Sequence, residues 1–148
     1  MFKHILLPTD GSALSEKGVR ETIKMAKALG AHITAVHVVQ RFRPLTDEVY
    51  VLPEVPLLRA QFEQDVERHS KEVLNPVKQA ALKAGVECET VVAAADSPSE
   101  AIIDQAKKSR CDLIMMASHG RRGIQRLLHG SETARVLTHS KIPVLVLR

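Results

Sequence analysis

The sequence is poor in aromatic residues: they make up 3% of its 148 residues, and tryptophan is absent. Proteins that bind single-stranded nucleic acids stack bases on aromatic side chains, so this scarcity argues against that class. Lys and Arg (21) outnumber Asp and Glu (17), but they are spread along the chain apart from a cluster at Arg121, Arg122 and Arg126. We therefore expect no nucleic acid partner.

Cysteines and long apolar runs are also scarce. The two cysteines, Cys88 and Cys111, have no CxxC spacing and lie in apolar, strand-like segments, which predicts buried, reduced thiols in a cytosolic protein. No run approaches the roughly 18 apolar residues of a membrane-spanning helix, and the apolar start at residues 5–7 is too short for a signal peptide. We expect a soluble, cytoplasmic protein without a membrane partner.

Several common catalytic and ligand motifs are missing as well. The sequence contains no GxxxxGK[ST], no GxGxxG and no GxSxG, which argues against P-loop proteins, dinucleotide-binding Rossmann domains and serine hydrolases. Its seven histidines share no i, i+4 helical spacing, and no Cys or carboxylate completes a familiar ligand set. We expect no metal site built from these histidines.

Five apolar segments alternate with four amphipathic ones along the chain. Strands are predicted at residues 2–7, 31–39, 86–93, 111–116 and 142–147, each apolar along its length. Helices are predicted at residues 14–29, 59–84, 97–109 and 130–139, with a kink at Pro76 in the second. Residues 40–57 hold three prolines and no apolar period, which indicates a long loop of the kind that is often functional or mobile.

This alternation predicts an α/β fold: a single domain over residues 1–148 with a doubly wound, five-stranded parallel sheet and helices on both faces. Ligands bind such sheets at the carboxyl ends of the strands, where the strand order reverses. The order 3-2-1-4-5 would make the loops PTDGS and ASHGRRG face each other across a crevice. The order 2-1-3-4-5 would instead bring AAADSPSE there, and the placement of the polar and glycine-rich loops favours the first order.

The segment after the fourth strand offers two anion-receiving elements. Gly120 and Gly123 allow close backbone approach, and Gly130 begins a helix whose first N–H groups are free. Ser131 is able to cap that helix or to donate its hydroxyl to a phosphate. Glycines at strand–helix junctions are also ordinary turn and cap residues, so both interpretations stay open.

The pattern ASHG, nine residues, then GS, with PTDGS after the first strand, VHVV ending the second and IPVLVLR closing the chain, resembles the universal stress protein family. The resemblance covers the whole chain. The ATP-binding subgroup of that family is marked by G-x2-G-x9-G-[ST]; here Gly120, Gly130 and Ser131 match, whereas Ala117 stands at the first glycine. Alanine is tolerated there if the position needs only close approach, and it weakens binding if a left-handed backbone is required.

The resemblance implies an adenine nucleotide site. Asp10 would serve the ribose or a Mg²⁺-bound phosphate, and Val38 would meet adenine through its backbone. The implied nucleotide-binding residues are Pro8, Thr9, Asp10, Val38, Met116, Ala117, Ser118, His119, Gly120, Gly130, Ser131 and Glu132. Asp10 also fits the N-cap of the first helix, and the two roles are compatible.

Phosphoryl transfer needs a charge clamp on the γ-phosphate and a group that orients the attacking water. A backbone cradle supplies neither, so we expect ATP, with or without Mg²⁺, to be held with slow or no hydrolysis. We expect no catalytic residues, and at most weak ATPase activity or autophosphorylation. Nucleotide occupancy would order the loop at residues 40–57.

The last strand predicts assembly. Residues 142–147 would form a flat apolar sheet edge, which soluble proteins normally cover. Pairing with the same strand of a second copy would give a homodimer, and the alternative is that the chain's own long loop covers this edge. The sequence thus predicts an ATP-binding universal stress protein that acts as a dimeric, nucleotide-dependent sensor or regulator in a stress response. The alternative is a dimeric stress-response scaffold or adaptor that binds no nucleotide.

Overall fold

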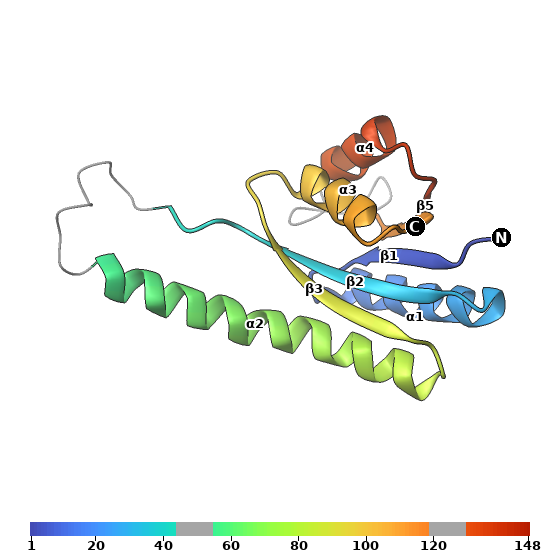
Figure 1. Cartoon of the computed structure of the whole chain (residues 1–148), viewed down its shortest axis with the longest axis horizontal. Coiled ribbons are helices and arrows are strands. Elements are labelled where there is room, and N and C mark those ends of the chain that lie inside the picture. Colours follow the sequence, from blue (N-terminus) through green and yellow to red (C-terminus); the bar gives the residue numbers. More distant parts are fainter. Residues whose placement is uncertain (44–54, 119–129) are drawn as a thin grey trace.

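The computed structural model describes residues 1–43, 55–118 and 130–148. Along the chain, the elements are β1 (His4–Pro8), α1 (Ala13–Leu29), β2 (His32–Val39), α2 (Val55–Lys83), β3 (Cys88–Ala94), α3 (Pro98–Lys108), β4 (Leu113–Ala117), α4 (Gly130–His139) and β5 (Val144–Leu147). The strands pair in parallel in the order β3-β2-β1-β4-β5 (Figure 1). The predicted α/β class and the order 3-2-1-4-5 are confirmed, and the alternative order 2-1-3-4-5 is wrong.

Helices cover both faces of the sheet (Figure 1). Successive side chains of a strand point to opposite faces. In β1, Ile5 and Leu7 pack in a cluster with residues of α1 and α2, whereas Leu6 packs in a second cluster with residues of α3 and α4. All three side chains are buried. Burial on both faces agrees with the apolar run that the sequence has at this strand.

Two of the helix starts follow from local capping. Ser12 is the N-cap of α1 and accepts a hydrogen bond from the Ser15 N–H, and Ser97 caps α3 in the same way through the Glu100 N–H. Pro98 occupies the first turn of α3, where no backbone donor is needed. These caps hold the loops that follow β1 and β3 close to the carboxyl ends of their strands.

Element boundaries differ from the prediction by a few residues, for example at α2 and β1. α2 begins at Val55, so residues 55–57 of the predicted loop are helical, and residues 44–54 of that loop lie outside the described residues. β1 extends to Pro8, because its ladder with β2 continues to the pair Pro8 and Val36. α2 contains Pro76 and continues to Lys83.

The edge strand β3 is less buried than the central strands. Its residues are either half-buried or exposed, and Val92 is 45% exposed. Both cysteines are free thiols, as predicted, but Cys88 in β3 is only half-buried, whereas Cys111 is buried. In the described part of the chain, no helix combines the length and the apolar character that crossing a membrane requires.

Candidate functional site

The loops that follow β1 and β4 lie next to each other at one edge of the sheet. β1 is flanked by β2 on one side and β4 on the other, so the chain winds outward in both directions from this pair of strands. Leu6 of β1 is in register with Ile114 of β4. The carboxyl ends of β1 and β4 therefore form the switch point at which open α/β sheets bind ligands.

Asp10 organises the loop after β1. One carboxylate oxygen, Oδ1, accepts hydrogen bonds from the Ser12 N–H (2.9 Å) and the Ser15 hydroxyl (2.5 Å). The N-cap of α1 is Ser12, so the interpretation of Asp10 as the N-cap is wrong: Asp10 precedes the cap and holds it in place. Both hydrogen bonds of the carboxylate within the described residues use Oδ1, which leaves Oδ2 available to a ligand.

Gly11 allows α2 to pack against this loop. Its φ is +79°, in the left-handed region that L side chains rarely adopt. A Cβ at Gly11 would lie 3.1 Å from Cγ2 of Val73 on α2. The positive φ therefore favours glycine here, and a side chain would in addition press on Val73.

Thr9 connects the loop to β2. Its N–H donates to the Val36 carbonyl (2.9 Å), and its carbonyl accepts from Nδ1 of His37 (3.0 Å), which places a proton on that nitrogen. His37 is buried, and its ring meets the ring of His69 on α2 edge-on, with centroids 5.6 Å apart. Both backbone groups of Thr9, its N–H and its carbonyl, are thus bonded to β2 just before the chain reaches Asp10.

A cavity of about 270 Å³ opens at this switch point, and we name it the switch-point cavity. Five of the predicted site residues line it: Pro8, Thr9, Asp10, Val38 and Glu132. Sequence analysis missed the other lining residues, which are Val36, His37, Gln40, Pro98 and Ile102. Two of these, Pro98 and Ile102, come from α3. This helix connects β3 to β4 across the sheet, and that predicted connection is the only feature of the sequence that could have indicated them.

Glu132 forms one wall of the cavity through contacts with α3. Its Oε2 accepts from the Ser99 N–H (2.8 Å) in the first turn of α3, and its Oε1 accepts from Arg135 (3.0 Å). The side chain is only 13% exposed. A carboxylate at a helix N-terminus is stabilised by the free N–H groups and the helix dipole, so Glu132 joins α4 to α3 beside the cavity.

Met116 and Ala117, at the end of β4, do not line this cavity. Met116 is fully buried in the cluster between the sheet and the α3 and α4 layer. Ala117 is buried on the opposite face, where its methyl group would lie 3.0 Å from a Cβ built on Gly18 of α1. Among the described non-glycine residues, positive φ occurs at Arg110 alone, so Ala117 has an ordinary strand backbone. The residue at the first position of the motif, Ala117, therefore does not need a left-handed backbone conformation in this chain.

The rest of the predicted phosphate segment is described only in part. The Ser118 N–H donates to the Leu147 carbonyl (2.8 Å), which continues the ladder between β4 and β5. His119 and Gly120 lie outside the described residues, as do the three arginines of the basic cluster. Gly130 and Ser131 form the first residues of α4, as predicted for a helix start.

Comparison with known proteins adds sequence relatives and solved structures. The chain is 32% identical to universal stress protein MJ0531 of Methanocaldococcus jannaschii, over 100% of this chain and 83% of the relative. It is 31% identical to universal stress protein YxiE of Bacillus subtilis, over the full length of both. The solved structure of protein MJ0577 matches with a TM-score of 0.78 and 24% identity, over 99% of this chain and 96% of that one.

Two further structures of the same fold contain nucleotides. The universal stress protein of Archaeoglobus fulgidus in complex with dAMP matches with a TM-score of 0.68 and 19% identity, over 100% of this chain and 98% of that one. The universal stress protein family protein of Arabidopsis thaliana with AMP bound matches with a TM-score of 0.68 and 16% identity, over 98% and 90%. The model of the universal stress protein family matches residues 1–148. The chain therefore belongs to the universal stress protein family.

Proposed function

We propose that this chain binds an adenine nucleotide at the switch point and acts as a nucleotide-dependent sensor or regulator in a stress response, with ATP as its ligand. The observation that carries the proposal is the switch-point cavity, which is lined by five residues to which the family resemblance gives a nucleotide-binding role. Structures of the same fold from Archaeoglobus fulgidus and Arabidopsis thaliana hold dAMP and AMP, which supports this choice of ligand.

The chemistry of the cavity favours the nucleoside end of the ligand. Its volume of about 270 Å³ is at the lower limit of ordinary ligand pockets. Val38, Pro98 and Ile102 offer apolar surface to a base, and Asp10 and Glu132 offer carboxylate oxygens to ribose hydroxyls or to the adenine amino group. The same carboxylates repel phosphates, so the phosphates would lie toward the motif residues Gly120, Gly130 and Ser131.

Asp10 also fits a role toward Mg²⁺. Magnesium is usually held by one or two carboxylates together with substrate phosphates and water. No cluster of three or more metal-ligating side chains occurs among the described residues, so Mg²⁺ would reach this site with the nucleotide, and Oδ2 of Asp10 would be its ligand. Bound in this way, the ion would offset phosphate charge near the two carboxylates.

We further propose that hydrolysis is slow. Stabilising the transition state of phosphoryl transfer requires cationic groups at the γ-phosphate. Neither Lys nor Arg is found among the described residues that line the switch-point cavity. A bound nucleotide would then stay intact, and the occupancy of the site would follow the concentration of free nucleotide.

Assembly through β5 forms part of the proposal. Pro143 and Leu147 direct their carbonyls to β4, at 2.9 and 2.8 Å, so the alternate residues Val144 and Val146 direct their backbone groups to the open edge. Val146→Pro removes one of these outward donors. We expect this variant to be monomeric by light scattering and Val146→Thr to remain dimeric; a dimeric Val146→Pro protein would refute pairing through β5.

The nucleotide proposal is tested by titration calorimetry with adenosine, AMP and Mg-ATP, after acid release of any nucleotide retained during purification. Asp10→Asn keeps the Oδ1 acceptor and removes the charge, and we expect it to weaken binding about tenfold, as for a lost hydrogen bond to a charged group. Equal weakening of all three ligands would assign Asp10 to the ribose, and weakening of Mg-ATP alone would assign it to the metal.

Asp96→Asn is the matched control, because Asp96 pairs with Arg43 at the surface and does not line the cavity. It should bind all three ligands like the wild type. If no adenine nucleotide is released and none of the three ligands gives heat, the nucleotide proposal fails. The alternative of a scaffold without nucleotide then holds.

A further inference from the structure

A second and larger cavity lies on the other face of the sheet. It has a volume of about 680 Å³ and lies open to solvent between α2, β3 and the chain leaving β2; we name it the α2 groove. Residues Phe62, Val66, Ser70 and Leu74 line it from α2, at the spacing of one helix face, and Thr90 and Val92 line it from β3. The volume is in the range of sites that bury a whole small molecule.

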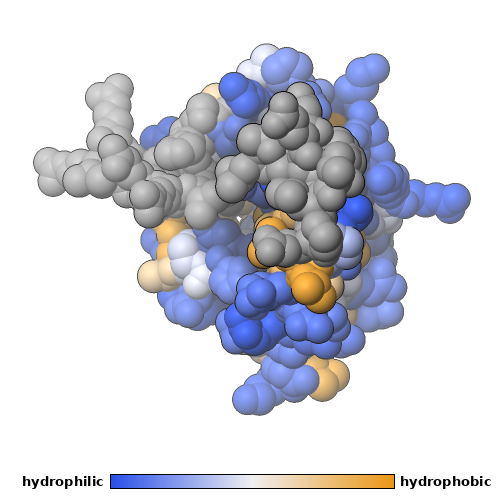
Figure 2. Space-filling model, turned by 90° about the vertical axis from the view of Figure 1, so that its left-hand side faces the viewer, coloured by the Kyte–Doolittle hydropathy of each residue, from blue (hydrophilic) through white to orange (hydrophobic). Residues whose placement is uncertain are grey.

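The walls of the α2 groove are mainly apolar. Phe42 and Phe62 approach each other across one part of it, with ring centroids 5.3 Å apart. Val92 is the exposed residue of β3 noted above, and its surface belongs to this groove. Figure 2 views the molecule from the end at which α2 begins and shows hydrophobic residues exposed among hydrophilic ones.

Ser70 supplies a polar group inside these apolar walls. It is 2% exposed, and its hydroxyl oxygen has no hydrogen-bond partner among the described residues. A helical serine commonly donates to the carbonyl four residues earlier, and burying a hydroxyl without any partner is costly. A ligand with a polar atom beside Ser70 would remove this cost.

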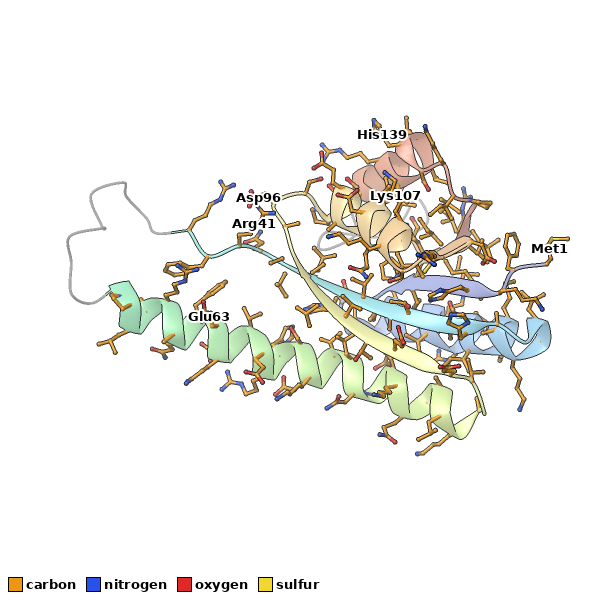
Figure 3. The ribbon with its side chains drawn as sticks, in the orientation of Figure 1. Met1, Arg41, Glu63, Asp96, Lys107 and His139 are labelled. Atoms are coloured by element: carbon orange, nitrogen blue, oxygen red, sulfur yellow. The ribbon has the colours of Figure 1, made fainter. Side chains whose placement is uncertain are left out.

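The charged residues at the rim favour a negative group on that ligand. Arg59 pairs with Glu63 and Lys71 pairs with Glu67, so both carboxylates of the rim already have cationic partners. Arg41 donates from Nε to the Ala94 carbonyl (3.4 Å) and forms no ion pair with a described residue. Figure 3 shows Arg41 on the chain leaving β2 and Glu63 on α2, at the same end of the molecule. Among the described residues of the rim, Arg41 is therefore the one cation without a carboxylate partner.

We propose that the α2 groove is a second ligand site, for an elongated apolar molecule with one anionic end group. Its body packs against Phe62, Val66 and Val92, its anionic group meets Arg41, and an inner polar atom bonds Ser70. This function is separate from the proposed nucleotide function, because the two cavities lie on opposite faces of the sheet. Gln40 lines both, so the segment leaving β2 is common to the two sites.

Two fluorescent probes that differ by one group test the proposal. 1-Anilinonaphthalene-8-sulfonate has an apolar body, an N–H donor and a sulfonate, and N-phenyl-1-naphthylamine is the same molecule without the sulfonate. We expect the full-length protein to bind the sulfonate saturably, and more tightly than the uncharged probe. Arg41→Gln should weaken the sulfonate about threefold, the effect of losing an exposed charge pair, and leave the uncharged probe unchanged.

Val66→Trp fills the groove and should abolish binding of both probes by calorimetry. Leu82→Trp is the matched control, because Leu82 is an exposed residue of α2 outside the groove; it should bind like the wild type. Ser70→Ala should weaken both probes without lowering thermal stability, since the free protein loses only a hydroxyl without a partner.

Amide chemical shifts locate the probe whether or not the nucleotide proposal holds. Shifts at Ser70, Thr90 and Val92 support the second site. Shifts confined to Val38 and Ile102, at the switch-point cavity, overturn it. Binding by Val66→Trp with wild-type affinity overturns it as well.

Discussion

Gly18 and Ala117 provide a sharp test of how α1 packs on the sheet. Gly18 is buried, and a Cβ at this position would lie 3.0 Å from the Ala117 Cβ, closer than nearly all real contacts of this kind. Ala117 cannot easily retreat, because β4 is paired with β1 and β5 on its two sides. We therefore expect Gly18→Ala to force α1 away from β4.

Two opposing effects decide the free energy of unfolding of Gly18→Ala. Replacing glycine by alanine inside a helix contributes about 1 kcal/mol of stability. Overpacking a buried contact costs about 1–3 kcal/mol, and the upper half of that range applies because both sides are backbone-anchored methyl groups. The expected net effect is a loss of about 1–2 kcal/mol.

The double variant Gly18→Ala/Ala117→Gly removes the clash by deleting the opposing methyl group. Chemical denaturation of the wild type, both single variants and the double variant gives the coupling energy, which we expect to be favourable by about 1–3 kcal/mol. A Gly18→Ala protein that is more stable than the wild type would refute the packing argument. Ala117→Gly should leave nucleotide affinity unchanged, since the Ala117 methyl group faces α1 and not the switch-point cavity.

Three further outcomes are expected. Gly11→Ala should destabilise the fold by about 1–3 kcal/mol in chemical denaturation, because it combines positive φ with a contact to Val73; unchanged stability would show that α2 yields. Burial, and next the charge of His32, lower the pKa of His4 below its ordinary 6.5, so stability is fully present above that pH and falls as the pH drops below it; the slope of Tm against pH should flatten in His4→Gln, and an equal slope would contradict this. Burial raises the pKa of Cys111 to about 12, so its alkylation by iodoacetamide at pH 8 should require unfolding, and rapid labelling of the native protein would argue against a buried thiol.

The sheet order was predictable because the loops that follow the strands differ from one another in composition. Polar and glycine-rich residues follow β1 and β4, so the order that makes these two strands neighbours was favoured, and the structure has that order. Pro8, Thr9 and Asp10 were identified for the same reason, since they follow a buried strand at the switch point. The alternation of apolar strands and amphipathic helices along the chain was sufficient to locate this part of the site.

Contacts that arise only when elements pack were not predictable. His37 lies within an apolar strand, and nothing in its neighbours indicates that its ring bonds the Thr9 carbonyl. Glu132 was assigned to a nucleotide, but its contact with the Ser99 N–H depends on how α4 docks on α3. The fit of Ala117 against Gly18 likewise depends on α1 crossing β4 at one particular height. The roles of His119 and Gly120 stay predictions.

The central position of β1 has a consequence for synthesis on the ribosome. Leu6 pairs on one side with Thr34, which emerges soon afterwards, and on the other with Ile114, which emerges much later. The nascent β1–β2–β3 portion is therefore able to assemble while its inner margin still lacks β4. Until that partner arrives, one edge of β1 is unpaired and its apolar side chains are only partly covered, so the nascent chain is more prone to aggregation than the folded protein.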